Sequence, residues 1–172
     1  MEQYVLLIDD KSCWGCKACE VACKQENQTP EGIKHISVSE DGPKIMAEKL
    51  DFVYRVKRCL HCEQPPCAEA CPVEAITKRA DGLVILDGET CTGCGVCVEA
   101  CPYKAIGYDE QTGKAYKCNL CVHRVDQGLI PACADNVCLA HCIIFSPADR
   151  GERMIADKTL VKERLAADQE GR

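Results

Sequence analysis

Residues 91–102 read CTGCGVCVEACP, and this short stretch decides the fold. Its four cysteines follow the spacing C-x2-C-x2-C-x3-C and end in proline. The same cysteine spacing occurs at 13–23 (CWGCKACEVAC), and a variant with a longer middle step occurs at 59–71 (CLHCEQPPCAEAC). A looser fourth group lies between residues 118 and 142. Seventeen of the 172 residues are cysteine, and sixteen of them fall into these four groups of four.

The spacing makes these cysteines candidate ligands of iron–sulfur clusters. In a C-x2-C-x2-C-x3-C-P run, three cysteines hold one 4Fe–4S cluster and the fourth reaches a neighbouring cluster. Sixteen thiolates match four 4Fe–4S clusters with four ligands each. The predicted ligands are Cys13, Cys16, Cys19, Cys23, Cys59, Cys62, Cys67, Cys71, Cys91, Cys94, Cys97, Cys101, Cys118, Cys121, Cys133 and Cys138.

Two other uses of many cysteines fit less well. Disulfide scaffolds belong to oxidising compartments, and an odd count of 17 pairs badly. Structural zinc sites use C-x2-C pairs that are separated by a longer loop, unlike a compact run of four cysteines. Zinc fits best at the irregular group between residues 118 and 142.

Composition and charge narrow the function. Aromatic residues make up only 5% of the chain, so the clusters are expected to serve as much of the core, and folding should require metal. The formal charge is -6, and four clusters at about -2 each bring it to about -14, which disfavours binding to nucleic acid. The sequence shows no long apolar stretch and no export signal, which predicts a soluble, cytoplasmic protein.

Short elements are expected between the cysteine groups. Residues 4–9 and 51–58 have the pattern of strands, and residues 16–24 that of a short helix which returns a thiolate one turn later. The segment 25–50 is polar and contains proline and glycine, which predicts an insertion loop.

The middle of the chain contains a repeat. The first copy, CPVEAITKRADGLVILDGETC, begins at Cys71, and the second, CPYKAIGYDEQTGKAYKC, begins at Cys101. Each copy begins Cys-Pro, carries an Ala-Ile pair and passes through a glycine turn, at 81–82 and at 112–113. Because cysteine groups bracket both predicted hairpins, the repeat indicates a two-cluster ferredoxin unit.

Residues between the ligands are candidates for tuning the clusters. Glycine lets backbone N–H groups approach a cluster closely, and lysine raises the local potential, although most lysines are simply solvated. The residues concerned are Gly15, Gly93, Gly95, Lys17, Lys24, Lys104 and Lys117. His61 stands between two ligands, but Rieske-type ligation needs two histidines, so its ring is expected beside the cluster.

The order and spacing of the groups carry a family resemblance from about Tyr4 to Phe145. The strings CKACEVACKQEN (16–27), CLHCEQPPC (59–67) and CNLCVHRVDQGLIPAC (118–133) resemble the iron–sulfur subunits of molybdenum and tungsten oxidoreductases. These are electron-transfer subunits of the dimethyl-sulfoxide-reductase, formate-dehydrogenase and polysulfide-reductase type.

The resemblance implies an α+β fold of two ferredoxin-like modules related by a pseudo-twofold axis. Each module is a two-cluster unit with short hairpins and short helices. The first module takes residues 1–58 and 118–146, and the second takes residues 59–117. Residues 147–172 are a charged C-terminal tail, predicted to form a helix that begins at Ser146-Pro147 and is either solvated or docked on a partner.

The resemblance also implies ligand sets that cross between the groups. One set is Cys59, Cys62, Cys67 and Cys101, and its neighbour is Cys91, Cys94, Cys97 and Cys71. A third set is Cys118, Cys121, Cys133 and Cys23. The fourth consists of Cys13, Cys16 and Cys19, completed by a cysteine from the last group.

That last ligand is where the chain departs from the family. The family has C-x3-C-P there, whereas this chain has Cys133, four other residues, and then Cys138 followed by Leu139. Cys138 has the family's usual distance to an aromatic residue, here Phe145. Cys142 restores an x3 step, but only from Cys138 itself. Cys138 is the predicted ligand, Cys142 is the alternative, and ligation by both is a third arrangement.

The resemblance implies an electron-transfer subunit of anaerobic metabolism, with four 4Fe–4S clusters forming a wire to or from a molybdenum- or tungsten-pterin catalytic subunit. No phosphate loop or flavin signature is visible, so no catalytic site of its own is expected. The implied partner is a tungsten aldehyde oxidoreductase, a benzoyl-CoA reductase or a formate dehydrogenase, the first two ranked higher, with further electron-transfer subunits. The alternatives are a free polyferredoxin and a metal or redox sensor, the latter disfavoured by the acidic charge.

Overall fold

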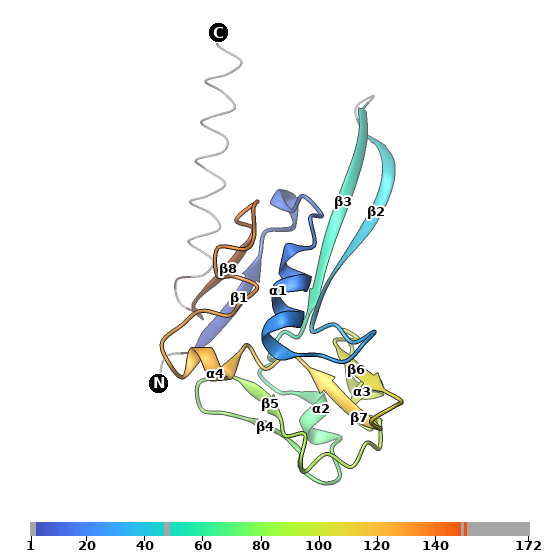
Figure 1. Cartoon of the computed structure of the whole chain (residues 1–172), viewed down its shortest axis with the longest axis vertical. Coiled ribbons are helices and arrows are strands. Elements are labelled where there is room, and N and C mark those ends of the chain that lie inside the picture. Colours follow the sequence, from blue (N-terminus) through green and yellow to red (C-terminus); the bar gives the residue numbers. More distant parts are fainter. Residues whose placement is uncertain (1–2, 47–48, 149, 151–172) are drawn as a thin grey trace.

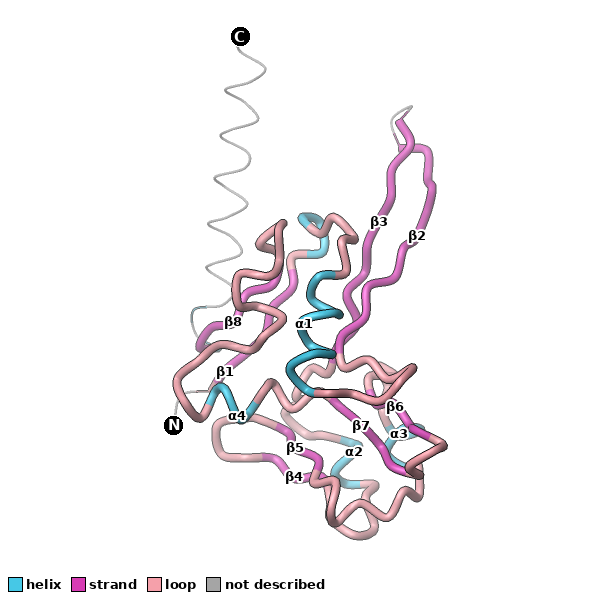
Figure 2. Tube along the Cα trace, viewed as in Figure 1, coloured by secondary structure: helices cyan, strands magenta, loops and turns pink. Residues whose placement is uncertain are grey.

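The strands of the computed structural model, which describes residues 3–46, 49–148 and 150, form four separate two-stranded antiparallel sheets (Figure 1). The elements in chain order are β1 (Tyr4–Ile8), a 3-10 turn (Asp10–Ser12), α1 (Ala18–Asn27), β2 (Ile36–Met46), β3 (Lys49–Arg58), α2 (Pro66–Glu69), β4 (Ile76–Lys78), β5 (Val84–Leu86), α3 (Val96–Ala100), β6 (Ile106–Asp109), β7 (Lys114–Lys117), α4 (Val122–Val125) and β8 (Ile143–Pro147). Much of the remaining chain is loop (Figure 2), and these loops carry many of the cysteines.

Strands from opposite ends of the sequence pair with each other. β1 and β8 lie side by side in Figure 1, with Tyr4 opposite Pro147 and Ile8 opposite Ile143. The rings of Tyr4 and Phe145 stack with their centroids 5.1 Å apart. The strand predicted at 4–9 is therefore confirmed.

The segment 25–50 is not the loop that its polarity predicts. Its first residues complete α1, and β2 pairs with β3 in a long hairpin that projects from the body (Figure 1). Ile36 and Val38 are buried, but the residues beyond them are mostly exposed. The strand therefore shows little of the alternation of apolar and polar residues that is typical of a half-buried strand. Of the prolines and glycines that indicated a loop, Pro30 and Gly32 lie in the turn before β2, and Gly42 and Pro43 lie where the strand register shifts.

The two short hairpins predicted from the repeat are confirmed. β4 pairs with β5, with Ile76 opposite Leu86, and β6 pairs with β7, with Ile106 opposite Lys117. Glycine at position 82 and at position 113 has a positive φ, as the turns require.

The core consists of two clusters in which cysteine is a major component. The larger one gathers around β1, α1, β2 and β8, and five of its eleven buried residues are cysteine. The smaller one lies among β4, β5, β6, β7, α2 and α3. Leu83, fully buried, comes from the β4–β5 hairpin yet packs in the larger cluster, so it joins the two parts of the molecule.

The predicted C-terminal helix lies almost wholly outside the described residues. Ser146 and Pro147, expected to open that helix, instead end β8, and the N–H of Ala148 donates to the carbonyl of Gln3 at 2.8 Å. Within the described part of the chain, no helix has the length and apolar character to cross a membrane.

Candidate metal centres

The structure brings the cysteines together in four groups, here called sites I to IV. Site I is Cys13, Cys16, Cys19 and Cys138; site II is Cys23, Cys118, Cys121 and Cys133; site III is Cys59, Cys62, Cys67 and Cys101; and site IV is Cys71, Cys91, Cys94 and Cys97. The cysteines of sites I, III and IV line three cavities. Cys142 also lines the cavity of site I.

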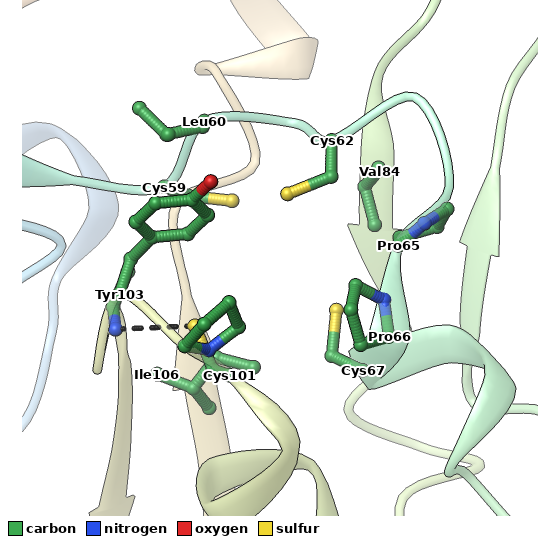
Figure 3. A pocket seen from close by; sticks show the side chains of 12 residues that line it. Cys59, Leu60, Cys62, Pro65, Pro66, Cys67, Val84, Cys101, Tyr103 and Ile106 are labelled. Atoms are coloured by element: carbon green, nitrogen blue, oxygen red, sulfur yellow. Dashed lines mark hydrogen bonds between the residues drawn. The ribbon is translucent and has the colours of Figure 1, made fainter.

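Site III shows the arrangement most clearly. The sulfurs of Cys59, Cys62 and Cys67 point into one open space, and Cys101 closes it from the end of α3 (Figure 3). Prolines, Val84 and other apolar side chains form the remaining walls. Four sulfurs around an apolar space suit a compact inorganic body that is bound only through sulfur.

Site II is the most buried site. Cys23 comes from α1 and reaches Cys121, and the amide of Asn27 donates to both sulfurs at 3.6 Å. Burial, with a smaller effect of Cys118 and Cys121, raises the pKa of Cys23 to about 12. Burial likewise raises the pKa of Cys133 strongly, and Cys118 and Cys23 raise it further. Thiols in such a place become thiolates only when metal supplies the compensating positive charge.

All four sites share one backbone feature. The residue two places after the first cysteine of each group has a positive φ, which turns successive N–H groups inward as in an anion-binding nest. These residues are Gly15, His61, Gly93 and Leu120. The N–H of His61 donates to the sulfur of Cys59, and that of Leu120 to the sulfur of Cys118, both at 3.4 Å.

Gly93 has a second reason to be glycine. A Cβ at this position would lie 1.7 Å from the carbonyl oxygen of Gly113, so the β6–β7 turn approaches the loop of site IV too closely for any side chain. At Gly95, which has the same φ of 75°, a Cβ would meet nothing within 4 Å. The two glycines that the sequence singled out in this loop therefore serve different purposes.

A second shared feature concerns the cysteine that crosses between groups. In three of these cysteines the sulfur accepts a hydrogen bond from the backbone N–H of the residue four places later. The dashed line in Figure 3 marks this hydrogen bond in site III. The bonds are Ala75 to Cys71 (3.3 Å), Ala105 to Cys101 (3.4 Å) and Cys142 to Cys138 (3.3 Å). Cys138 therefore takes the same local conformation as Cys71 and Cys101.

A buried cation lies between sites II and III. Lys117 is buried, and its ammonium donates to the carbonyl of Val84 and, at 2.7 Å, to that of Cys118. Burial raises the pKa of Cys62 and of Cys67, and Lys117 opposes this rise. The other three lysines expected near ligands, at positions 17, 24 and 104, are exposed.

Sequence reasoning missed a second cation in the same place. Arg58 ends β3 directly before Cys59, and its guanidinium donates to the carbonyl of Leu6, at 3.0 Å from Nε. Burial lowers the pKa of Arg58, and the neighbouring Cys118, Asp10 and Cys59 oppose this fall. Only its place between a strand and a ligand group distinguished it in the sequence.

The ring of His61 does not line the cavity of site III. Its Nδ1 accepts the N–H of Val84 at 2.9 Å, so the remaining proton of the neutral ring is on Nε2. Burial, with smaller effects of Lys117 and Arg58, lowers the pKa of His61 to about 3. The ring is therefore neutral near pH 7 and helps to join β5 to the loop of site III.

Electrostatic interactions between sites give them an order. Cys19 of site I raises the pKa of Cys133 in site II, and Cys59 of site III raises the pKa of Cys118 in site II, in each case after the larger effect of burial. Cys67 of site III has the same effect on Cys97 of site IV. Cys19 of site I and Cys23 of site II also lie one turn apart on α1, and Cys71 of site IV follows Cys67 of site III by four residues, so the sites follow one another as I, II, III and IV.

The two ends of this series are the most accessible. Cys16 in site I and Cys94 in site IV are exposed, whereas three of the four cysteines in site II are buried and the fourth, Cys118, is half-buried. The series therefore has an exposed cysteine at each end, and the sites between them are better protected from solvent.

The arrangement of the sulfurs fits iron–sulfur clusters. The described residues include all 17 cysteines and contain no disulfide. In the same part of the chain, no group of three or more His, Cys, Asp or Glu side chains is arranged to hold a single metal ion. Sulfurs spread around open cavities suit a body with several metal atoms.

Comparison with known proteins agrees with the cysteine pattern. Two family profiles, both described as a 4Fe–4S dicluster domain, match residues 50–147 and 12–75. The thiosulfate reductase electron transfer subunit of Salmonella typhi is 38% identical over 168 residues, covering 95% of this chain and 87% of the relative. A polysulfide reductase component of Wolinella succinogenes is 34% identical, covering 94% of this chain and 87% of the relative.

A third relative is longer than this chain. A tetrathionate reductase subunit of Salmonella typhimurium is 41% identical over 139 residues, which cover 78% of this chain but only 54% of the relative. The formate dehydrogenase-O iron-sulfur subunit of Escherichia coli, 34% identical over 181 residues, shows the same pattern, with 96% and 58% covered. The chain carries 4Fe–4S clusters, four in number, and belongs to the family of iron–sulfur subunits of molybdenum and tungsten oxidoreductases.

Proposed function

We propose that this chain is the electron-transfer subunit of a larger redox complex, in which four clusters form a wire to or from a molybdenum- or tungsten-pterin catalytic subunit. The observation that carries the proposal is that the four cysteine sites form one connected series through shared segments such as α1, with an exposed cysteine at each end. A linear series of clusters with two accessible ends suits the transfer of electrons from one partner protein to another.

The ligands of this wire are the members of sites I to IV. A cysteine-bound 4Fe–4S cluster supplies one-electron transfer when bound. The chain holds each cluster with four thiolates, excludes water from site II and directs N–H groups at the ligand sulfurs. Lys117 and Arg58 place positive charge between sites II and III, which favours the more negative, reduced state there.

Cys138 is the fourth ligand of site I in this proposal. Its backbone conformation and its N–H···S bond are those of Cys71 and Cys101, the crossing ligands of sites IV and III. The inserted residue before Cys138 and the missing proline after it therefore leave the local geometry of the ligand intact.

The division into two modules is also part of the proposal. The first module is formed by residues 1–58 and 118–146 and the second by residues 59–117, and the two core clusters largely follow this division. The backbone features repeated in all four groups support a pseudo-twofold relationship between the modules.

The catalytic partner is proposed from the relatives. Their names describe subunits of tetrathionate, thiosulfate, polysulfide and dimethyl sulfoxide reductases and of formate dehydrogenase. A partner of the formate dehydrogenase type agrees with one of the expected partners. The higher rank given to an aldehyde oxidoreductase or a benzoyl-CoA reductase stays a prediction, as does the cytoplasmic location.

Anaerobic purification of the tagged chain from its native host tests the proposal. We expect a pterin-containing subunit to co-purify, and about 16 iron and about 16 sulfide per chain of this subunit. A monomer that carries the full iron but never associates with a pterin protein would favour the free polyferredoxin. An iron content of about 12 would mean that one of the four sites holds no cluster.

A further inference from the structure

The segment CLAHCI at residues 138–143 has the conformation of the two hairpin entries, CPVEAI (71–76) and CPYKAI (101–106). In all three segments, the residue three places after the first cysteine has a positive φ, and its N–H donates to the carbonyl of that cysteine. The residues are Glu74 (51°, 3.2 Å), Lys104 (49°, 3.0 Å) and His141 (48°, 2.8 Å). The third copy is hidden in the sequence because leucine replaces the proline.

This repeat shows what Cys142 replaces. Cys142 occupies the position of Ala75 and Ala105, which are buried, line the cavities of sites IV and III and donate an N–H to the crossing ligand. Cys142 is equally buried, lines the cavity of site I and donates its own N–H to Cys138. Site I therefore differs from its two counterparts by one additional thiol.

The additional thiol lies against a ligand. The sulfur of Cys142 is 3.4 Å from the sulfur of Cys138, in the cavity that Cys13 also lines. A cysteine that binds iron is a thiolate and has no proton to donate. Once Cys138 is a ligand, only Cys142 can therefore supply the proton of the bond between the two sulfurs.

We infer that Cys142 is a positioning residue of site I, whose S–H donates to the sulfur of the ligand Cys138 and raises the reduction potential of the cluster held there. A hydrogen bond to a ligand sulfur stabilises the reduced, more negative state of a cluster more than the oxidised state. The inference rests on the proposed ligand set, in which Cys138 and not Cys142 binds iron.

The test compares three variants of the full chain, purified anaerobically in its complex: Cys142→Ala, Cys142→Ser and Cys138→Ala. Iron and sulfide analysis is combined with a redox titration followed by electron paramagnetic resonance. The signal that Cys138→Ala removes or converts identifies the cluster of site I. Cys142→Ala should keep the full iron content. It should lower the equilibrium constant for reduction of the cluster that gives this signal by up to about tenfold, which is about 59 mV for one electron. Cys142→Ser should stay near the wild-type value because its hydroxyl also donates.

A matched variant transfers the feature to another site. Ala105→Cys places a thiol beside Cys101 in site III, in the position that Cys142 has in site I. We expect unchanged iron content and a higher potential for the site III cluster alone, identified by the signal that Cys101→Ala removes. No shift in that signal would count against the inference.

The outcomes separate this inference from the ligand set on which it rests. If Cys142→Ala loses a cluster and Cys138→Ala does not, the assignment of Cys138 is wrong and the inference falls with it. If Cys138→Ala loses a cluster but Cys142→Ala leaves every potential unchanged, the ligand set stands and the inference is overturned. A serine variant with the potential of the alanine variant also overturns it.

Discussion

Two regions of the molecule present their cysteines in similar loops but differ in how far apart in the sequence their paired strands lie. We call them the terminal region (residues 3–46, 49–58 and 118–147) and the hairpin region (residues 59–117). In the hairpin region each sheet is a local hairpin, such as Ile76–Leu86. In the terminal region β2 and β3 also form a local hairpin, but β1 pairs with β8 across most of the chain. Loop-closure entropy is small for the local pairs and larger for the distant one. The terminal region therefore depends on sites I and II, whose cysteines come from both ends of the sequence.

The largest effect should follow from removing a buried ligand of the terminal region. Cys133→Ser deletes a sulfur of site II that lies within the larger core cluster, so one whole cluster and most of the folded yield should be lost. Cys94→Ser is the matched change in the hairpin region. Because Cys94 is exposed, water or the serine can complete the site, and the loss of iron and folded yield should be smaller.

Iron analysis and the yield of soluble chain, measured side by side, check this difference. We expect about 12 iron for Cys133→Ser and between about 12 and 16 for Cys94→Ser. Equal yields for the two variants would mean that the two regions depend on their clusters to the same degree.

A smaller effect is expected at the junction between the regions. Lys117→Met leaves the buried carbonyls of Val84 and Cys118 without their donor, which should cost about 2 kcal/mol of unfolding free energy. Loss of the positive charge should also lower the potentials of the clusters at sites II and III. Denaturant titration of the holo chain and a redox titration measure the two effects.

Lys24→Met is the control for the junction. Lys24 donates to the carbonyls of Thr29 and Pro30 but is exposed, so its loss should cost less than about 1 kcal/mol and leave the potentials unchanged. If both variants shifted the potentials equally, the position of Lys117 between the sites would have no special effect.

The smallest effect should come from the β1–β8 sheet. Phe145→Ala removes a ring that is half-buried and stacked on Tyr4, at a cost of about 1 to 2 kcal/mol. Hydrogen exchange should then become faster in β1 and β8, while β4 to β7 keep their protection. Equal loss of protection in both regions would show that they open as one unit.

The sequence predicted those features of the molecule that depend on residues close together in the chain. Cysteine spacing gave the four groups, and the glycine turns at 81–82 and 112–113 gave both short hairpins, because each signal lies within about twenty residues. The extent of β2 was missed because its outer part is exposed on both faces and shows no alternation. The pairing of β1 with β8 was also missed, since no short-range pattern specifies a partner so far away.

Individual residues around the sites were harder to predict for a similar reason. A positive φ is expected at Gly15 and Gly93, but His61 and Leu120 adopt it as well, held by their bonds to ligand sulfurs. Such a conformation costs a residue other than glycine about 1 kcal/mol, so the surrounding structure must impose it. The burial of Lys117 likewise depends on which strands pack over it, and the sequence alone did not distinguish it from the exposed lysines.

The pairing of opposite ends of the chain has a consequence during synthesis. In the proposed ligand set, site I takes three cysteines from residues 13–19 and its fourth from Cys138, so the ribosome must add more than a hundred residues between them. At about 5 to 20 residues per second this takes about 6 to 25 s. The hairpin region is translated in full within that interval. Its two clusters are thus able to load first, while the earliest cysteines of the nascent chain wait without iron and need protection from oxygen or a chaperone.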